Sequence, residues 1–169
     1  MRLRVPSGFL LAAAFAWWAA PDPPSLAWGA PVSLAGLLLR AWAAGHLAKN
    51  QALATGGPYA WVRNPLYLGT LLVALGLAIA SRQAGLAALF AAVFVLVYLP
   101  AIQLEEEHLR KLFPEYENYA RRVPSLAPRP PAVRSGERFR FELYVKNQEY
   151  QALAGYLAGL GLLGWKVWG

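Results

Sequence analysis

Two short polar motifs, each beside an apolar run, carry the residue types that a ligand-binding site requires. The first, residues 57–69, reads GPYAWVRNPLYLG and supplies hydroxyl, guanidinium and amide groups. The second, residues 105–119, reads EEEHLRKLFPEYENY and opens with three consecutive carboxylates. An apolar helical hairpin between the motifs would return the chain to the side where it began. We therefore expect both motifs to form one pocket.

The first motif has features of a helix N-terminus. Asn64 and Pro65 are typical of the N-cap and of the first helical turn. The free N–H groups and the positive end of such a helix can hold a carboxylate. A well-capped membrane helix, with Tyr59 and Trp61 at the interface between lipid and water, explains the same residues without a ligand. These residues alone leave both interpretations open.

The second motif places carboxylates at the C-terminal end of a membrane helix, where the negative helix end opposes them. A cationic ligand would offset this repulsion. Because Glu105, Glu106 and Glu107 span nearly one helical turn, at most two of them can face a pocket. The alternative is a solvated acidic face that pairs with Arg110 and Lys111 at helical spacing.

The composition indicates an integral membrane protein, since 57% of the 169 residues are hydrophobic and only 15% are charged. The absence of Cys excludes disulfides, thiol catalysis and Cys-based metal sites. The two His residues are far apart, and we expect no metal. His46 is expected at the membrane interface. His108 is expected on an exposed turn, from which it could also reach the rim of the pocket.

The net charge of +7 raises the question of an anionic partner. Ten of the sixteen Lys and Arg residues lie between Arg110 and Lys166, mostly beside apolar segments. This placement favours an anionic membrane surface or lipid headgroup as the partner, and no nucleic acid.

Five apolar runs, each near the ~20 residues that a bilayer requires, predict an all-α polytopic membrane helical bundle. The runs are residues 5–20, 26–48, 65–80, 84–104 and 150–168. Pro100 predicts a kink in the fourth span. Four prolines within residues 124–131 forbid one long helix across the polar segment 105–142, so we expect a short cytoplasmic helical segment between the fourth and fifth spans.

We expect a single membrane domain over residues 1–169. Its parts would be a helical hairpin at 5–48, a core at 55–128 and an extra C-terminal transmembrane helix at 143–168. The basic start and length of the first run also fit a signal peptide, but a second apolar run follows at once, which favours a retained span. Gly155 and Gly159 have the spacing of a close helix contact, within the chain or in a homodimer, and a loosely packed Gly-rich span is the alternative.

The positive charges predict the orientation. With Arg2 and Arg4 in the cytoplasm, five spans place Lys49, Arg63 and the basic segment before the last span on the same side. The N-terminus and the pocket are therefore expected to be cytoplasmic. Arg40 falls inside the second span, where it would either snorkel to the surface or line a polar pocket.

The two motifs together resemble those of the isoprenylcysteine carboxyl methyltransferase and phospholipid methyltransferase superfamily of integral membrane enzymes. GPYAWVRNPLYLG is similar to the first signature, GPY…RHPxYxG. EEEHLRKLFPEYENYARRVPSLAP is similar to the second, an acidic pair followed by Leu, Phe, a Tyr-x-x-Tyr and RVP. The resemblance covers roughly residues 55–128, and GPYAW with ARRVP is closest to the carboxyl methyltransferase branch.

The resemblance implies S-adenosylmethionine as methyl donor, bound between the third and fourth spans and the segment that follows them. It also implies a lipophilic methyl acceptor that enters from the bilayer. The positions carried over as cofactor-binding are Tyr59, Arg63, Asn64, Tyr67, Glu105 and Glu106. The candidate catalytic residues are Glu106, Arg63 and Arg122.

Asn64 departs from the family pattern, which has His at this position. Asn donates and accepts hydrogen bonds but cannot carry a proton near neutral pH. A carboxylate acceptor is already a nucleophile and needs no base. Arg122, with Arg121, could hold an anionic acceptor headgroup or anchor the segment to the membrane surface.

The resemblance favours carboxyl O-methylation of an isoprenylcysteine-like substrate. Phospholipid N-methylation and methylation of a small thiol remain alternatives within the same class. Two other classes also remain open: an NADPH-dependent membrane reductase, since sterol reductases resemble the second motif, and a non-catalytic membrane protein.

Overall fold

The computed structural model describes residues 4–131 and 136–169, and within them it is built of helices and connecting segments. The prediction of an all-α fold is confirmed. The elements in chain order are α1 (Arg4–Trp18), α2 (Pro23–Ala44), the 3₁₀ turn η1 (Gly57–Ala60), α3 (Pro65–Ser81), α4 (Ala84–Val93), the π-helical turn η2 (Phe94–Tyr98), α5 (Leu99–Leu112), α6 (Tyr116–Arg122), α7 (Phe141–Lys146) and α8 (Tyr150–Trp168).

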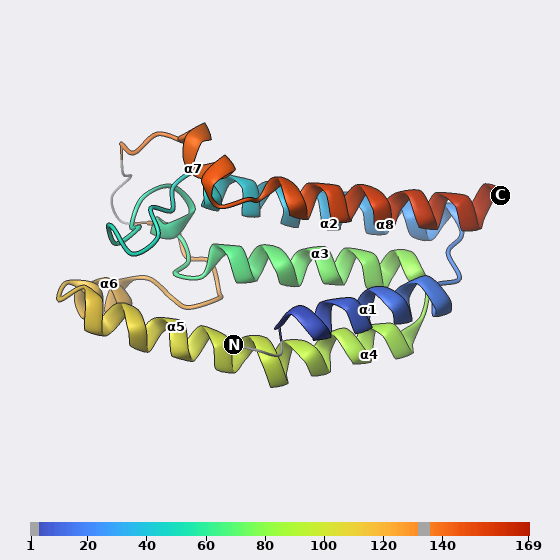
Figure 1. The fold of residues 1–169 in the computed structure, drawn as a ribbon, viewed down its shortest axis with the longest axis horizontal. Coiled ribbons are helices and arrows are strands. Elements are labelled where there is room, and N and C mark those ends of the chain that lie inside the picture. The colour runs from blue at the N-terminus through green and yellow to red at the C-terminus, as the bar shows by residue number, and fades with distance from the viewer. Residues whose placement is uncertain (1–3, 132–135) are drawn as a thin grey trace.

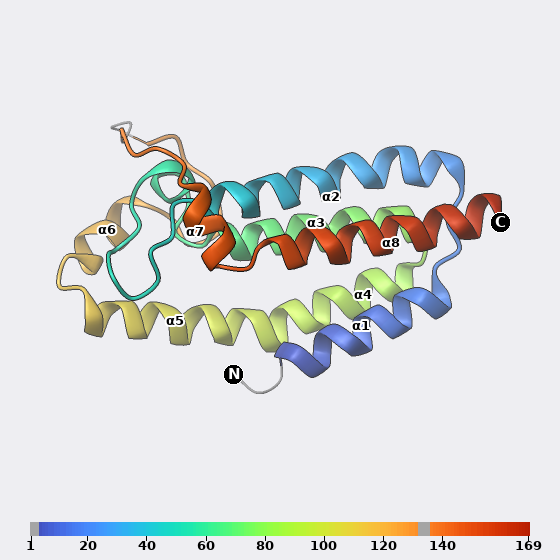
Figure 2. The same cartoon turned by 45° about the horizontal axis from the view of Figure 1, so that its top comes forward.

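The long helices lie side by side along the long axis of the molecule (Figure 1). The end of α2, the start of α3, the end of α5 and the start of α8 share one end of the bundle with α6 and α7 (Figures 1 and 2). The short α1–α2 and α3–α4 links and the C-terminus lie at the other end. The prediction that an apolar hairpin returns the second motif to the side of the first is confirmed.

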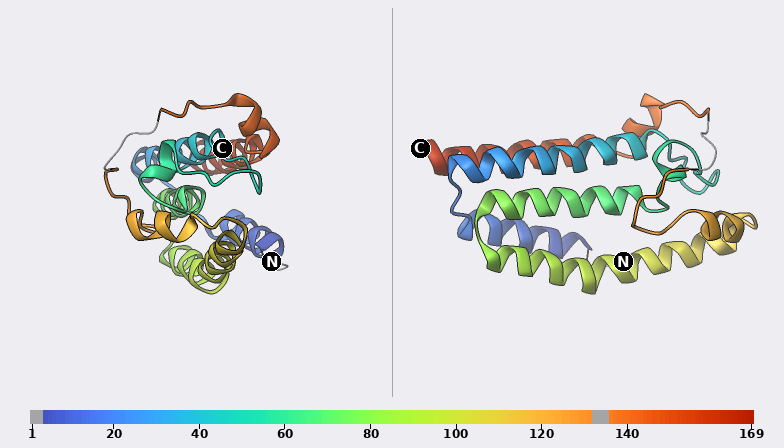
Figure 3. Two further views of the ribbon diagram at one scale, coloured as in Figure 1. Left: turned by 90° about the vertical axis from the view of Figure 1, so that its left-hand side faces the viewer. Right: turned by 180° about the vertical axis from the view of Figure 1, so that it is seen from behind.

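The first two helices are joined by the short link that was expected, but they do not form a packed pair. α1 packs against α4, whereas α2 packs against α3 and α8 (Figure 3). Asp22 begins α2 with a capping box, because its carboxylate accepts from the Ser25 N–H while the Ser25 side chain bonds the Asp22 N–H. α2 ends at Ala44, and Gly45 forms its C-cap. The helix therefore ends four residues before the apolar run does.

The fourth helix is longer than the apolar run predicted. The helical segment continues from Ala84 to Leu112, so the three glutamates lie inside the helix and not at its C-terminal end, where they were expected. The irregularity expected at Pro100 is the π turn η2 just before it, where the Leu99 N–H donates to the Phe94 carbonyl. Pro100 has no N–H to donate to the preceding turn, which favours such a local departure from α geometry.

Two helices of the described chain are long and apolar enough to cross a membrane by length and composition, Pro23–Ala44 and Ala84–Leu112. α3 is apolar but has only 17 residues. The exact five-span topology therefore stays a prediction. All seven Trp side chains are substantially exposed, which suits aromatic residues in contact with lipid; they are Trp17, Trp18, Trp28, Trp42, Trp61, Trp165 and Trp168.

The closest helix pair is α2 with α3, which meet through small residues. A Cβ atom at Gly36 would lie 2.6 Å from the Gly69 carbonyl oxygen. A Cβ atom at Gly76 would lie 2.7 Å from the Ser33 Cβ. The Ser33 hydroxyl bonds the Gly29 carbonyl within its own helix, so it presents no unpaired polar group to α3. These residues let the two backbones approach closely, as small residues do between membrane helices.

Gly36→Ala tests this contact. The added methyl group would meet the backbone of α3, and overpacking of this kind costs about 1–3 kcal/mol. We expect a lower thermal unfolding midpoint in detergent, followed by far-ultraviolet circular dichroism. Gly155→Ala is the matched control, because a Cβ at Gly155 meets nothing within 4 Å; an equal loss of stability in both variants would contradict the close α2–α3 packing.

Candidate active site

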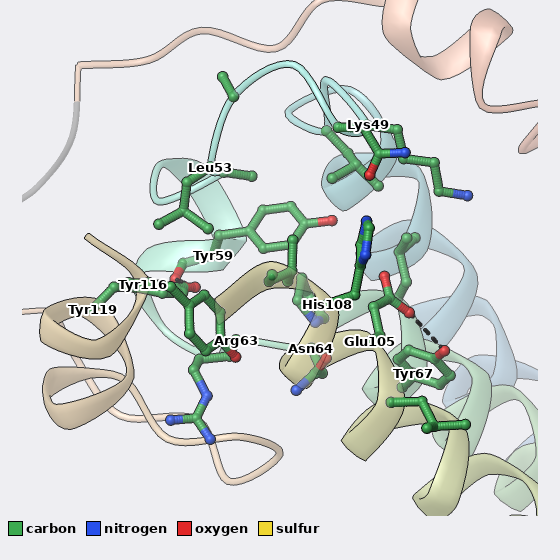
Figure 4. Close-up of a pocket in the computed structure, with 18 residues that line it drawn as sticks. Lys49, Leu53, Tyr59, Arg63, Asn64, Tyr67, Glu105, His108, Tyr116 and Tyr119 are labelled. Carbon is green, nitrogen blue, oxygen red and sulfur yellow. Dashed lines mark hydrogen bonds between the residues drawn. The ribbon is translucent and has the colours of Figure 1, made fainter. Parts of the chain in front are cut away.

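A cavity of about 430 Å³ lies at the end of the bundle where the two motifs meet. Its walls come from the α2–α3 connection, the first turn of α3, the end of α5 and the helix α6 (Figure 4). Ligand sites commonly enclose roughly 300–1,000 Å³, so the cavity has room for a small-molecule ligand. The prediction of one pocket formed by both motifs is confirmed.

The cavity wall includes most of the residues expected to bind a cofactor. Tyr59, Arg63, Asn64, Tyr67 and Glu105 all line it (Figure 4). Glu106 and Arg122 are not among the lining residues. Five of the predicted site residues therefore line the cavity, whereas Glu106 and Arg122 do not.

Glu105 presents its carboxylate to the cavity in a fixed orientation. The Tyr67 hydroxyl donates to Glu105 Oε2 at 2.8 Å (Figure 4). The Tyr67 ring in turn meets Tyr98 edge to face, with 6.1 Å between the ring centroids. Two packed rings thus hold one carboxylate in the wall, where it can receive a cationic group.

Glu106 has a different environment, although it is the next residue. It is 8% exposed and accepts hydrogen bonds from several donors of the protein. Its Oε1 accepts from Asn64 Nδ2 at 2.7 Å and from Ser125 Oγ at 2.9 Å. Both oxygens also accept from Arg63, at 3.3 Å for Nε with Oε1 and 3.1 Å for Nη2 with Oε2. The chain itself therefore satisfies this carboxylate.

The same cluster attaches the segment after α6 to the start of α3. Arg63 Nη1 donates to the Ala120 carbonyl at 2.6 Å. The main-chain N–H groups of Arg63 and Asn64 donate to the carbonyls of Pro124 and Ser125, at 2.8 and 3.1 Å. Glu106 with these partners therefore joins α3, α5 and the segment 120–125.

The prediction that Asn64 is the N-cap residue of α3, with Pro65 in the first turn, is confirmed. Its side chain makes no capping hydrogen bond, however. The Asn64 Nδ2 group donates to Glu106 and Ser125. The bond to the carboxylate is charge-assisted, and such bonds are stronger than neutral ones. It therefore orients the side chain toward Glu106.

Three tyrosines form the aromatic part of the wall. The Tyr119 hydroxyl donates to the Tyr59 carbonyl at 2.7 Å, and the rings of Tyr116 and Tyr119 meet edge to face. Burial raises the pKa of Tyr116 to about 12 and raises the pKa of Tyr59 and Tyr119 as well, with nearby Glu105 adding to the effect at Tyr59. All three rings are therefore neutral at physiological pH, and the cavity gains no negative charge from them.

Arg122 lies on the surface, outside the cavity. Its Nε donates to the Asn118 carbonyl at 3.1 Å within α6. With Arg121 and Arg129 it borders a separate hollow of about 270 Å³. The structure does not bring Arg122 together with the other predicted site residues.

The cavity lining also includes His108 and Lys49. His108 is exposed, as expected, and it lines the cavity three residues after Glu105 on the same helix, which was the alternative interpretation. Lys49 lies in the α2–α3 connection, where no helical periodicity predicts which way a side chain points. Within residues 4–131 and 136–169, no group of three or more His, Cys, Asp or Glu is placed to hold a metal ion.

Arg40 neither snorkels to the surface nor lines the cavity. Its guanidinium pairs with Glu149 at the start of α8 and bonds the Thr70 hydroxyl. The partner lies 109 residues away in the sequence, so no local pattern indicates the pair.

Comparison with known families fits this geometry. The family described as phospholipid methyltransferase matches residues 32–116, half of the chain, and that stretch includes most of the cavity wall. The chain belongs to the phospholipid methyltransferase family, within the superfamily of membrane methyltransferases that the two motifs resemble. With the two long apolar helices, this membership indicates a membrane protein.

Two curated relatives are similar over part of their length. The chain is 40% identical over 92 residues to the cobalt-zinc-cadmium resistance protein CzcN of Cupriavidus metallidurans, covering 53% of this chain and 43% of that protein. It is 38% identical over 98 residues to the nickel-cobalt-cadmium resistance protein NccN of Alcaligenes xylosoxydans xylosoxydans, covering 57% and 46%. The chain thus spans less than half the length of either relative. No solved structure matches.

The hydrogen bonds of Glu106 predict that its substitution affects stability more than substitution of its neighbour Glu107. Glu106→Gln leaves Arg63 with an uncompensated charge in a mostly buried site, and breaking such a pair costs about 3–5 kcal/mol. Glu107→Gln changes an exposed carboxylate and should leave stability nearly unchanged. Thermal unfolding of both variants in the same detergent provides the measurement. Equal stability of Glu106→Gln and the wild type would refute a structural role for the cluster.

Proposed function

We propose that the protein is an S-adenosylmethionine-dependent integral membrane methyltransferase that acts on a lipophilic acceptor. The observation that carries the proposal is the cavity at the meeting point of the two motifs, with Glu105 oriented into it by Tyr67. Family membership supports the same class of reaction. S-adenosylmethionine supplies an activated methyl group for in-line displacement by a nucleophile.

The residues of the cavity fit this donor. Its ammonium and sulfonium groups are cationic and suit Glu105 and the faces of neutral Tyr59 and Tyr116. Its carboxylate suits the positive end of α3 and Lys49 at the rim. Arg63 and Glu106, which bond each other, would hold the wall in place rather than bind the ligand through free charges.

Positioning the acceptor behind the methyl group is then the main catalytic task. Orientation of this kind can supply about 7–11 kcal/mol of barrier reduction. The Tyr59, Tyr67 and Tyr98 rings would restrict the reacting groups, and closure of the cavity by a lipophilic acceptor would exclude water.

A second hollow supports a lipophilic acceptor. It has a volume of about 160 Å³, is lined mostly by apolar side chains of α1, α3 and α4, and extends to Thr70 and Tyr98. Tyr98 packs on Tyr67, which holds Glu105, so the apolar hollow and the cavity adjoin through this aromatic pair. An acyl or prenyl chain in the hollow would place its polar end near Glu105.

The acceptor group we favour is a carboxylate, as in an isoprenylcysteine-like substrate. A carboxylate needs no base, and Glu106 is already occupied by Asn64, Ser125 and Arg63. An amine or a small thiol would have to lose a proton, and His108 is the cavity residue suited to accept it. Arg121 and Arg122 would hold an anionic headgroup at the membrane surface rather than act on the methyl group.

The wider setting we propose is a multi-pass protein whose N-terminus and site face the cytoplasm. The exposed face of α8, where Gly155 has open space beside it, would suit a second copy of the chain. A second candidate function follows from the two relatives, whose names refer to metal resistance. That candidate is a membrane component of such a system that methylates a small thiol or is not catalytic.

Binding of S-adenosylmethionine to the purified protein in detergent, measured by calorimetry, tests the cofactor class. We expect Glu105→Gln to weaken binding about tenfold or more, because a charge-assisted contact is lost. Glu107→Gln should bind like the wild type. Binding of NADPH instead would favour the reductase, and binding of neither ligand by a folded sample would favour the non-catalytic alternative.

The acceptor can be identified with donor labelled in the methyl group. We expect transfer to a prenylated cysteine analogue with a free carboxylate, as a base-labile ester, and no transfer to the matching carboxamide. Base-stable label on phosphatidylethanolamine or on a small thiol would contradict the carboxylate assignment. Ala74→Trp, which fills the apolar hollow, should reduce transfer to the prenylated analogue while leaving donor binding unchanged.

A further inference from the structure

The turn between α7 and α8 inserts two polar side chains into the bundle. Gln148 has a φ of 56°, in the left-handed region, so the helical path of α7 does not continue into α8. Asn147 and Glu149, on either side of it, both make contacts inside the bundle. Glu149 is 6% exposed. The turn lies outside the part of the chain that the family matches.

Glu149 reaches the wall of the cavity through Arg40. The carboxylate and the guanidinium form a two-point pair, with 3.0 Å between Nη2 and Oε2. The remaining nitrogen of Arg40, Nη1, donates to the Thr70 hydroxyl and to the Leu66 carbonyl. Leu66 lines the cavity in the first turn of α3, next to Tyr67. The contact thus fixes the helix turn that orients Glu105.

Asn147 reaches the opposite wall. Its Nδ2 donates to the carbonyls of Ala44 and Leu47, at 3.0 and 2.9 Å. These carbonyls lie where α2 ends and the connection to α3 begins, and Leu47 itself lines the cavity. The Arg140 N–H adds a bond to the Gly45 carbonyl at 2.9 Å. Residues near the C-terminal end of the chain therefore hold the start of the α2–α3 connection in place.

Stability alone does not account for a buried ion pair in this position. Removal of two charges from water offsets most of their attraction, and apolar residues of similar volume are often at least as stabilising. The pair does, however, have directional hydrogen bonds that a packed apolar pair cannot replace. Its particular contribution is therefore geometric.

We propose that the α7–α8 turn positions the two walls of the cavity for the methyl donor. Glu149, through Arg40, sets the first turn of α3, and Asn147 sets the start of the α2–α3 connection. Neither residue touches the ligand, so both are positioning residues. The identity of the ligand rests on the proposed function, whereas the positioning of the walls does not.

The first test compares stability with binding. We expect the double variant Arg40→Met with Glu149→Leu to unfold near the wild-type temperature, yet to bind S-adenosylmethionine roughly tenfold more weakly or worse, because small misplacements of a wall are costly to binding and catalysis. Asn147→Leu should have the same effect on affinity. Glu142→Gln, an exposed change on α7, is the matched control. Wild-type affinity in a folded double variant would overturn the proposal.

The second test does not depend on the ligand. The chain has no Cys, so Ala54→Cys, half-buried in the cavity wall, introduces a single thiol. We expect Asn147→Leu and the double variant to change the rate of maleimide labelling at this position several-fold. Labelling at Lys111→Cys, an exposed site on α5, should not change.

The two tests separate the two proposals. A changed labelling rate without any S-adenosylmethionine binding by the wild type would retain the positioning role and refute the proposed cofactor. Unchanged labelling in both backgrounds would overturn the positioning role, whether or not the donor binds.

Discussion

One buried carboxylate, Glu106, determines the arrangement of the cavity end. A charged oxygen pair removed from water requires donors, and the chain supplies them from Arg63, Asn64 and Ser125. To supply them, the start of α3, the end of α5 and the segment after α6 must converge. The cavity lies beside the place where these segments meet. Glu105, the residue before Glu106, is the carboxylate that remains available to a ligand.

The close packing of α2 and α3 provides the frame on which this convergence is built. Gly36 and Gly69 allow the two backbones to approach, so the connection between these helices folds back over the start of α3 and forms one side of the cavity. The far end is closed by apolar contacts among Phe15, Leu86 and Leu163. Lipid-facing helices thus fix the position of a polar site at their ends.

Much of this arrangement could be predicted from the sequence. Apolar runs gave helices whose bounds at 65 and 150 match the structure, and the hairpin logic placed both motifs at one end. The sequence patterns did not predict hydrogen bonds between residues that are far apart in the chain. Asn64 was correctly predicted as the N-cap of α3, but its side chain bonds Glu106, 42 residues away, and makes no capping hydrogen bond. The Arg40–Glu149 pair and the choice among three consecutive glutamates depend on packing that no local pattern contains.

The π turn at Phe94–Tyr98 gives that last choice a physical origin. A wide turn holds more residues than an α turn, so it changes the angular phase of everything that follows by about one residue, or roughly 100°. Adjacent glutamates differ by the same angle. Regular α geometry through the apolar segment would thus rotate another side chain into the place of Glu105. The number of residues in one turn of the apolar helical segment, which lies outside both motifs in the sequence, therefore determines which carboxylate faces the cavity.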